Sequence, residues 1–225
     1  MRLSTLLSCA VLAATASAAS ADPIFKITEL WTGLSGPDGA ADWLEVTNFG
    51  DMPGDTGTLY YDDENPTIES GGQLDSFILA PGESAVFLTD SEPADETFAD
   101  SLSEFAAIWG GGIRVGLTNG GGNLGQGGDQ ANLLLGDGSI IASFDYSASG
   151  DVATFEDPTG DGPIALSSIG VNGAYESAAF VNENLALPPG TTITMIGSPG
   201  RVPEPTAVAL AGLAMAALSL GRSRR

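Results

Sequence analysis

The sequence contains no histidine, and this absence removes several kinds of site. Catalytic triads that need an imidazole base, and zinc, iron or copper centres held by histidine, cannot be assembled. Basic residues are also scarce, since seven Lys and Arg stand against 29 Asp and Glu and the formal net charge is −22. Because such a charge repels phosphate backbones, we expect no nucleic-acid partner.

Cysteine occurs once, as Cys9, within an apolar N-terminal run. Residues 1–21 begin with Arg2 and end in small residues that offer two A-x-A cleavage sites, which finish at Ala18 and Ala21. This order predicts a secretory signal peptide, because the run is too short to span a bilayer. A lipoprotein box at Cys9 is the alternative, but the apolar run continues beyond it. We therefore expect an exported, cysteine-free mature protein that is stabilised by packing.

The C-terminus also has three parts in order. They are Val202, Pro203, Glu204 and Pro205, then an apolar run over residues 206–221, then Arg222, Arg224 and Arg225. As a helix the run would reach about 24 Å, close to the ~30 Å hydrocarbon core, with the arginines on the cytoplasmic side. A buried core helix is the alternative, although the run has no polar face.

This C-terminal order resembles the PEP-CTERM sorting signal of Gram-negative bacteria. The resemblance implies recognition and removal by exosortase, an integral membrane cysteine protease. It also implies an exported protein, held in the inner membrane by its C-terminal helix until processing and then located at the cell surface or outside the cell. Exopolysaccharide and other surface proteins are the partners that the resemblance suggests.

Residues 22–201 form the expected domain between these two ends. They keep 28 of the acidic residues and 3 of the basic ones, because Glu204 and four of the arginines lie in the ends. Hydrophobic residues make up 43% of the chain and charged ones 16%, so a core can be buried. The remainder is rich in Gly, Ser, Thr, Asn and Asp, which favours short strands joined by tight turns.

Period-two patterns predict strands along this domain. The predicted strands cover residues 24–31, 42–48, 77–79, 84–89, 131–135 and 139–146, with shorter candidates at 113–117, 152–155 and 192–196. Pro81-Gly82 predicts a turn, and residues 136–138 give the strongest hairpin signal. Residues 98–109 instead repeat apolar side chains at helical spacing before three glycines, which predicts one short helix packed on the sheet.

The domain also resembles the lamin-tail family. The motifs that carry the resemblance are residues 27–30 (ITEL), 42–48 (DWLEVTN) with Gly50 and Asp51, 79–88 (LAPGESAVFL), 128–129 (GD) before 133–135 (LLL), 144–146 (FDY) and 198–200 (SPG). Residues 90–112 and 157–184 look like insertions. The resemblance implies an all-β, immunoglobulin-like β-sandwich with one short helical insertion. Because no catalytic neighbour accompanies it, a freestanding binding or structural module is the natural inference.

Two glutamates stand inside apolar strands, Glu29 and Glu45. An ionised carboxylate there must be paired or face outwards. If the two converge, they could serve as acid and base on a sugar, which keeps a carboxylate-dependent glycan hydrolase as the alternative function. The interpretation that we favour is that each holds backbone or edge-strand groups of the sandwich, and we assign no catalytic residue.

Residues 157–162 offer a candidate calcium loop. Asp157, Thr159 and Asp161 place oxygen atoms at alternate positions before a glycine, as a hard cation requires. Ser168 occupies the place where such a loop has a bidentate glutamate, so an ordinary turn is the favoured interpretation. Calcium remains the candidate cofactor, and a calcium-stabilised adhesive surface protein is a further alternative.

Overall fold

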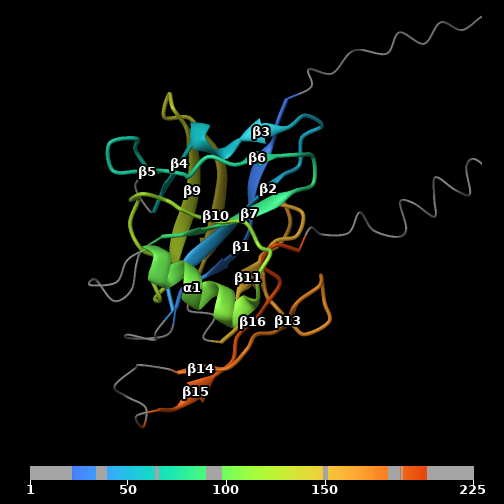
Figure 1. The fold of residues 1–225 in the computed structure, drawn as a ribbon. Coiled ribbons are helices and arrows are strands. Elements are labelled where there is room, and N and C mark those ends of the chain that lie inside the picture. Colours follow the sequence, from blue (N-terminus) through green and yellow to red (C-terminus); the bar gives the residue numbers. More distant parts are fainter. Residues whose placement is uncertain are drawn as a thin grey trace, which may run out of the picture.

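The computed structural model describes residues 22–33, 40–63, 66–89, 98–148, 152–181, 188 and 190–201. The predicted signal peptide and sorting signal, each with its expected helix, lie outside these described residues. Within them the chain consists of strands arranged in several sheets and one helix, α1 (Phe98–Trp109) (Figure 1). The prediction of an all-β fold with one short helix is therefore confirmed at this level.

The main sheet has six strands. In spatial order they are β12 (Ala165–Leu166), β11 (Phe155–Glu156), β1 (Phe25–Trp31), β2 (Trp43–Asn48), β7 (Ser84–Leu88) and β8 (Val115–Leu117). Neighbouring strands are antiparallel except for β7 and β8, which are parallel. The sheet therefore brings the start of the chain, β1, between a neighbouring early strand and a much later one.

A second sheet of four strands lies against it. Its order is β10 (Ile140–Tyr146), β9 (Asp129–Leu135), β4 (Leu59–Asp62) and β5 (Gly72–Gln73). Three two-stranded sheets complete the fold, formed by β3 (Gly54–Asp55) with β6 (Ile78–Leu79), β13 (Tyr175–Glu176) with β16 (Ile196–Gly197), and β14 (Phe180–Val181) with β15 (Thr192–Ile193). A short 3-10 helix, η1 (Thr56–Thr58), links β3 to β4.

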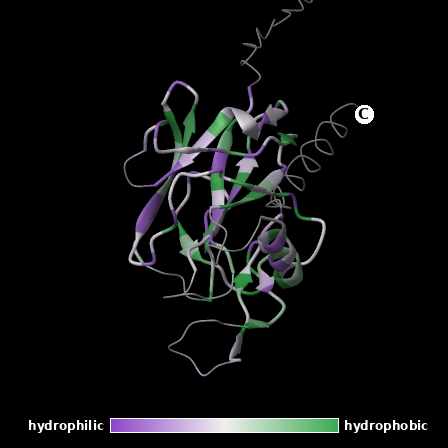
Figure 2. Ribbon diagram, turned by 60° about the vertical axis from the view of Figure 1, so that its left-hand side comes forward, coloured by the Kyte–Doolittle hydropathy of each residue, from purple (hydrophilic) through white to green (hydrophobic). Residues whose placement is uncertain are grey.

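The two larger sheets share one apolar cluster. Side chains from both sheets meet in it, and Leu44, Phe87, Leu133 and Phe144 are at most 1% exposed. Hydrophobic and hydrophilic residues alternate along the central strands, so each strand turns one set of side chains towards this cluster (Figure 2). Burial of this surface contributes roughly 25 cal/mol per Å² of apolar area.

The opposite face of the main sheet is also covered. Trp31, Trp43, Val86 and Leu88 pack there against Phe105, Ile108 and Trp109 of α1 and against Met195. Trp43 meets Phe105 and Trp109 edge-on, at ring-centroid distances of 6.0 and 5.9 Å. The predicted helix thus occupies its predicted residues and packs on the sheet (Figure 1).

Local turn signals gave the right elements. Strands β9 and β10 form the predicted hairpin, in which Gly138 has φ +84° and Leu135 N–H donates to Ser139 O. Pro81-Gly82 turns as expected, with Gly82 at φ +79°. The strands beside this turn do not pair with each other, because β6 pairs with β3 and not with β7. The predicted strand at 192–196 is divided between β15 and β16, which pair with different strands.

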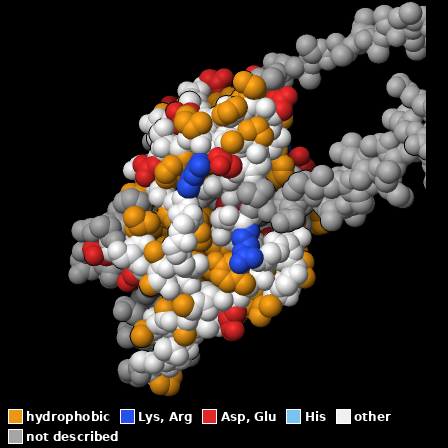
Figure 3. All heavy atoms as spheres, turned by 45° about the vertical axis from the view of Figure 1, so that its right-hand side comes forward, with side chains coloured by type: hydrophobic (Ala, Val, Ile, Leu, Met, Phe, Trp, Pro, Cys, Tyr) orange, Lys and Arg blue, Asp and Glu red, His pale blue; other side chains and the backbone are white. Residues whose placement is uncertain are grey.

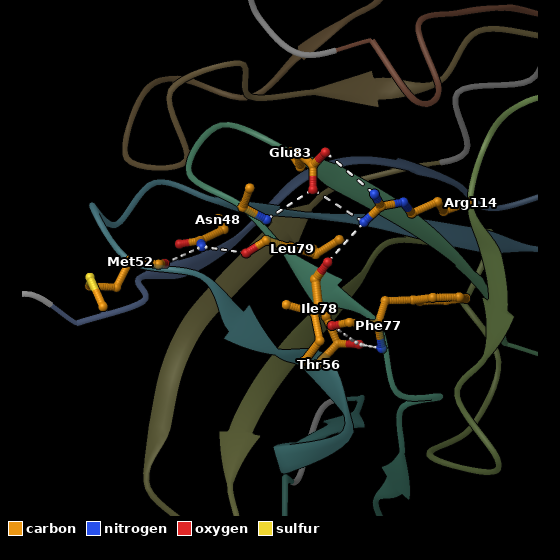
Figure 4. Close-up of polar contacts among 9 residues, drawn as sticks. Asn48, Met52, Thr56, Phe77, Ile78, Leu79, Glu83 and Arg114 are labelled. Carbon is orange, nitrogen blue, oxygen red and sulfur yellow. Dashed lines mark hydrogen bonds and ion pairs between the residues drawn. The ribbon is translucent and has the colours of Figure 1, made fainter.

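Asn48 fastens the end of β2 to its surroundings. Its Oδ1 accepts from Ile24 N–H and Gly50 N–H, and its Nδ2 donates to Met52 O and Leu79 O. Figure 4 shows the two donated bonds beside the turn that follows Leu79. Asn48 is itself fully buried and bonds four backbone groups, of which Leu79 O is buried as well.

The same turn carries an exposed ion pair. Glu83 accepts from Ala80 N–H and pairs with Arg114 at 3.2 Å, and Arg114 also donates to Ile78 O (Figure 4). On the face shown in Figure 3, basic side chains are sparse and acidic ones scattered, as the composition requires. No helix among the described residues is long and apolar enough to cross a membrane.

Replacing Asn48 tests how much this fastening contributes. We expect Asn48→Ala to lower the free energy of unfolding by about 2–4 kcal/mol, because it removes four hydrogen bonds, one of them to the buried Leu79 O. Urea denaturation followed by tryptophan fluorescence measures the change. Asn123→Ala, at an exposed asparagine, is the control and should stay within about 0.5 kcal/mol of the parent. Equal losses in the two variants would contradict this role for Asn48.

Candidate functional site: a buried row of glutamates

Three glutamates lie side by side on adjacent strands of the main sheet. In the strand register Glu29 of β1 stands opposite Glu45 of β2 on one side and opposite Glu156 of β11 on the other. Their exposed fractions are 1%, 2% and 5%. Directly opposed residues have Cβ atoms about 4.5–5.5 Å apart, so three acidic groups share a small dry region.

The alternation of β2 explains the position of Glu45. Leu44 and Val46 point into the cluster between the two larger sheets, which leaves Trp43, Glu45 and Thr47 on the opposite face. In β1 the register shifts between Ile27 and Glu29, so Thr28 has no residue opposite it. This bulge interrupts strict alternation and aims Glu29 at Glu45.

Glu29 is held by hydroxyl and backbone donors. Thr154 Oγ1 and Ser198 N–H donate to its Oε1, the latter at 2.7 Å, and Ser198 Oγ donates to its Oε2 at 2.9 Å. Gly197 allows this approach, because a Cβ atom there would lie 2.7 Å from Glu29 Oε1. The carboxyl group is thus surrounded by groups of the protein itself.

Glu45 is held in the same way. Thr28 Oγ1 donates to its Oε1 at 2.7 Å, while Ser84 Oγ and Gly200 N–H donate to its Oε2 at 3.2 and 2.6 Å. Glu156 accepts through Oε1 from Asn172 Nδ2 at 3.1 Å. Glu29 and Glu45 therefore both accept hydrogen bonds from the chain segment that contains Ser198 and Gly200.

The hollow beside the row is small. Its volume is about 10 Å³, and it is lined by the three glutamates with Thr28, Pro158, Asn172, Ser198 and Arg201. A volume of about 10–15 Å³ admits one water molecule, whereas ligand pockets measure about 300–1,000 Å³. A sugar ring cannot enter the site in this conformation.

Arg201 supplies the positive charge at this hollow. Its guanidinium lies over the ring of Tyr175, 4.5 Å from the centroid, and the Tyr175 hydroxyl donates to Trp109 O. Arg201 is thereby placed beside the acidic row and against the aromatic cluster at once. The last described residue of the chain is thus tied to α1 through Tyr175.

Burial controls the protonation of the row. Loss of water, and then the charge of Glu45, raises the pKa of Glu29 well above its ordinary value. Loss of water also raises the pKa of Glu45, and the hydrogen bonds from Thr28, Gly200 and Ser84 offset part of the rise. Burial raises the pKa of Glu156 as well. Burial therefore favours the protonated form of each glutamate in the row.

Of the three candidate calcium residues, Asp157 and Thr159 contact each other, whereas Asp161 pairs with a lysine. Asp157 is 5% exposed, and its Oδ1 accepts from Thr159 N–H, Thr159 Oγ1, Gly160 N–H and Gly162 N–H. Asp161 turns towards Lys26 and pairs with its Nζ at 2.8 Å. Asp157 thus organises its own turn, and no group of three or more acidic residues in the described ranges is arranged to hold a metal ion.

A larger hollow lies elsewhere, between the start of β1 and the second sheet. Its volume is about 300 Å³ and its lining is mostly apolar: Pro23, Ile24, Phe25, Lys26, Thr58, Leu59, Leu135 and Ile141. Its polar side chains are those of Lys26, which pairs with Asp161, and Thr58. Of the sequence-predicted site residues, Ala18, Ala21, the sorting motif at 202–205 and the arginines at 222, 224 and 225 lie outside the described residues.

From the sequence we singled out Glu29 and Glu45 but missed Glu156 and Thr154, and we quoted residues 198–200 as a motif without predicting that they bond the glutamates. Glu156 directly follows the predicted strand at 152–155, and that adjacency was the available signal.

No protein-family model, curated protein or solved structure matches the chain. The lamin-tail and PEP-CTERM resemblances therefore stay predictions.

The buried row should make stability depend on pH. A raised folded-state pKa means that the folded state binds more protons than the unfolded one, so stability is full below the ordinary value near 4.5 and is lost as pH rises through the raised values. We expect the free energy of unfolding to fall by about 1–3 kcal/mol between about pH 5 and about pH 8. Urea denaturation across this range measures it.

Charge-removing variants isolate the row from general acidic repulsion. Glu29→Gln and Glu45→Gln should flatten the pH dependence, because each removes a group that must ionise in a dry site. Glu69→Gln, at an exposed glutamate, should leave the slope unchanged. The same slope in all four proteins would show that the row does not cause it.

Calcium should have little effect on the described turn. Because the carboxylate of Asp157 already accepts bonds from four donor groups and Asp161 pairs with Lys26, we expect equal melting temperatures in calcium and in chelator at matched ionic strength. Differential scanning calorimetry measures both. A higher melting temperature in calcium, abolished by Asp157→Asn, would revive the calcium-stabilised adhesive alternative.

Proposed function

We propose that the chain is an exported, non-catalytic binding or structural module of the lamin-tail type, sorted to the cell surface or extracellular matrix by exosortase. The observation that carries the proposal is the use of Glu29 and Glu45. Both carboxyl groups accept bonds from the domain's own chain, next to a hollow of about 10 Å³. Acidic residues placed in this way support a fold and have no room for a substrate.

The fold supports an immunoglobulin-like sandwich as the finer assignment. Two sheets share one apolar cluster, and nearly all strand pairings within them are antiparallel. The motifs quoted for the lamin-tail resemblance fall at structurally demanding places, including Asn48, the Pro81-Gly82 turn and the segment at 198–200. These residues are ones that a shared fold would require.

The charge of the domain supports a role at the cell surface or outside the cell. With 28 acidic residues against 3 basic ones, the surface is hydrated and repels copies of itself. We propose exopolysaccharide or other surface proteins as partners. The membrane is a partner only before processing, through residues 206–221.

A carboxylate-dependent glycan hydrolase is the alternative function. It would use Glu29 and Glu45 as acid and base, and their raised pKa values suit such roles. Hydrolysis would require the segment at 198–201 to leave the site and open a space for a sugar. Under the leading proposal the glutamine variants change stability, whereas under this alternative they abolish activity in a correctly folded protein.

The mature termini test both sorting predictions together. We expect protein recovered from the surface of its native cells to begin at residue 19 or 22 and to lack Arg225, as measured by intact-mass spectrometry. Cells without exosortase should retain Arg225, which provides the control. Surface material that uniformly keeps Arg225 would contradict processing, and material that keeps Met1 would contradict the signal peptide.

A further inference from the structure

The end of the domain is held by the same two glutamates that define the candidate site. Ser198 donates to Glu29 through both its backbone N–H and its hydroxyl, and Gly200 N–H donates to Glu45. We call residues 198–201 the latch. Arg201 N–H donates back to Ser198 O, so the latch is itself a turn.

The latch packs closely against the residues around it. Gly200 has φ +72°, a conformation that favours glycine, and a Cβ atom there would lie 2.9 Å from Ile113 Cγ2. The guanidinium of Arg201 covers the ring of Tyr175 at 4.5 Å. A protease must lift these residues off the sheet before it can bind them in an extended form.

We infer that Glu29 and Glu45 hold the latch closed and so determine how readily a protease cuts the chain after Arg201. Val202, the first residue of the predicted sorting motif, follows Arg201 directly. A consequence for sorting rests on the proposed function, since only then does exosortase act on the following residues. The latch itself stands on the contacts of described residues.

Charge should regulate the latch. The titratable or charged groups that face Glu29 and Glu45 are Glu156 on β11, Arg201 in the latch and Tyr175 on β13. Of these only Arg201 is positive, so full ionisation of the glutamates leaves an excess of negative charge in a dry place. Opening the latch admits water to both carboxylates, and the latch should therefore open more often as pH rises.

Trypsin provides a probe that does not depend on exosortase. In residues 22–201 it can cut after Lys26, Arg114 and Arg201, and the products are assigned by mass. Lys26 lies within β1 and Arg114 directly before β8, so cutting there reports opening of the main sheet. We expect cleavage after Arg201 in the full chain to be at least about tenfold slower than in a peptide of residues 196–206.

Two variants should loosen the latch while both glutamates are kept. Gly200→Ala should speed cleavage after Arg201 by about tenfold, because it strains the turn and presses on Ile113. Ser198→Ala, which removes one of the two bonds from Ser198, should act in the same direction more weakly. Gly170→Ala is the matched control, since Gly170 has φ +82° with no atom near its Cβ position, and it should leave the rate after Arg201 unchanged.

The pH series uses the same assay between about pH 7 and about pH 9, normalised to the peptide to remove the enzyme's own pH dependence. The normalised rate after Arg201 should rise with pH in the parent and stay level in the Glu29→Gln/Glu45→Gln double variant. A level rate in the parent would overturn control by charge.

Other outcomes would overturn the latch itself. These are peptide-like cleavage after Arg201 in the parent, no acceleration in Gly200→Ala and Ser198→Ala, or acceleration shared equally with Lys26 and Arg114. Failure of exosortase processing in cells would overturn the proposed function and leave the trypsin result unaffected, so the two failures can be distinguished.

Discussion

The placement of like charges opposite one another in a dry sheet is the constraint on which much of this structure depends. Glu29 and Glu45 face each other across neighbouring strands, and Glu156 extends the row. Two such carboxyl groups persist only if protons or donors neutralise them. The hydroxyls of Thr28, Ser84, Thr154 and Ser198 and the backbone N–H groups of Ser198 and Gly200 supply those donors.

This constraint explains why the main sheet is covered on both faces. One face forms the apolar cluster shared with the second sheet, and the other is divided between aromatic packing under α1 and the acidic row. Without residues 198–201 the row would be open to water, and the glutamates would ionise and repel each other. The segment at 198–201 therefore belongs to the fold as much as any strand, although it is not one.

Local physics made part of this architecture predictable. Residues 98–109 and the hairpin at 131–146 were correctly predicted, because apolar periodicity and turn glycines act over a few residues. The row was only half predictable. Glu29 and Glu45 stood out as acids within apolar strands, but Glu156 joins them through a pairing across 127 positions, and the bulge at Thr28 depends on the register of the assembled sheet. The pairing of β6 with β3 was not predictable either, because it joins segments more than twenty residues apart.

The acidic residues of this protein thus serve two physical roles. Exposed ones, spread over a surface with almost no positive charge, keep the domain hydrated and separate from its copies. The buried row does the opposite and draws a chain segment inwards. Apolar burial is a poor way to hold a segment of serine, proline and glycine, because such a segment has little apolar side-chain surface. Carboxyl groups can hold such a segment by accepting hydrogen bonds from its backbone N–H groups. Because ionisation of the carboxyl groups changes how strongly the segment is held, this anchor responds to pH, whereas a packed leucine would not.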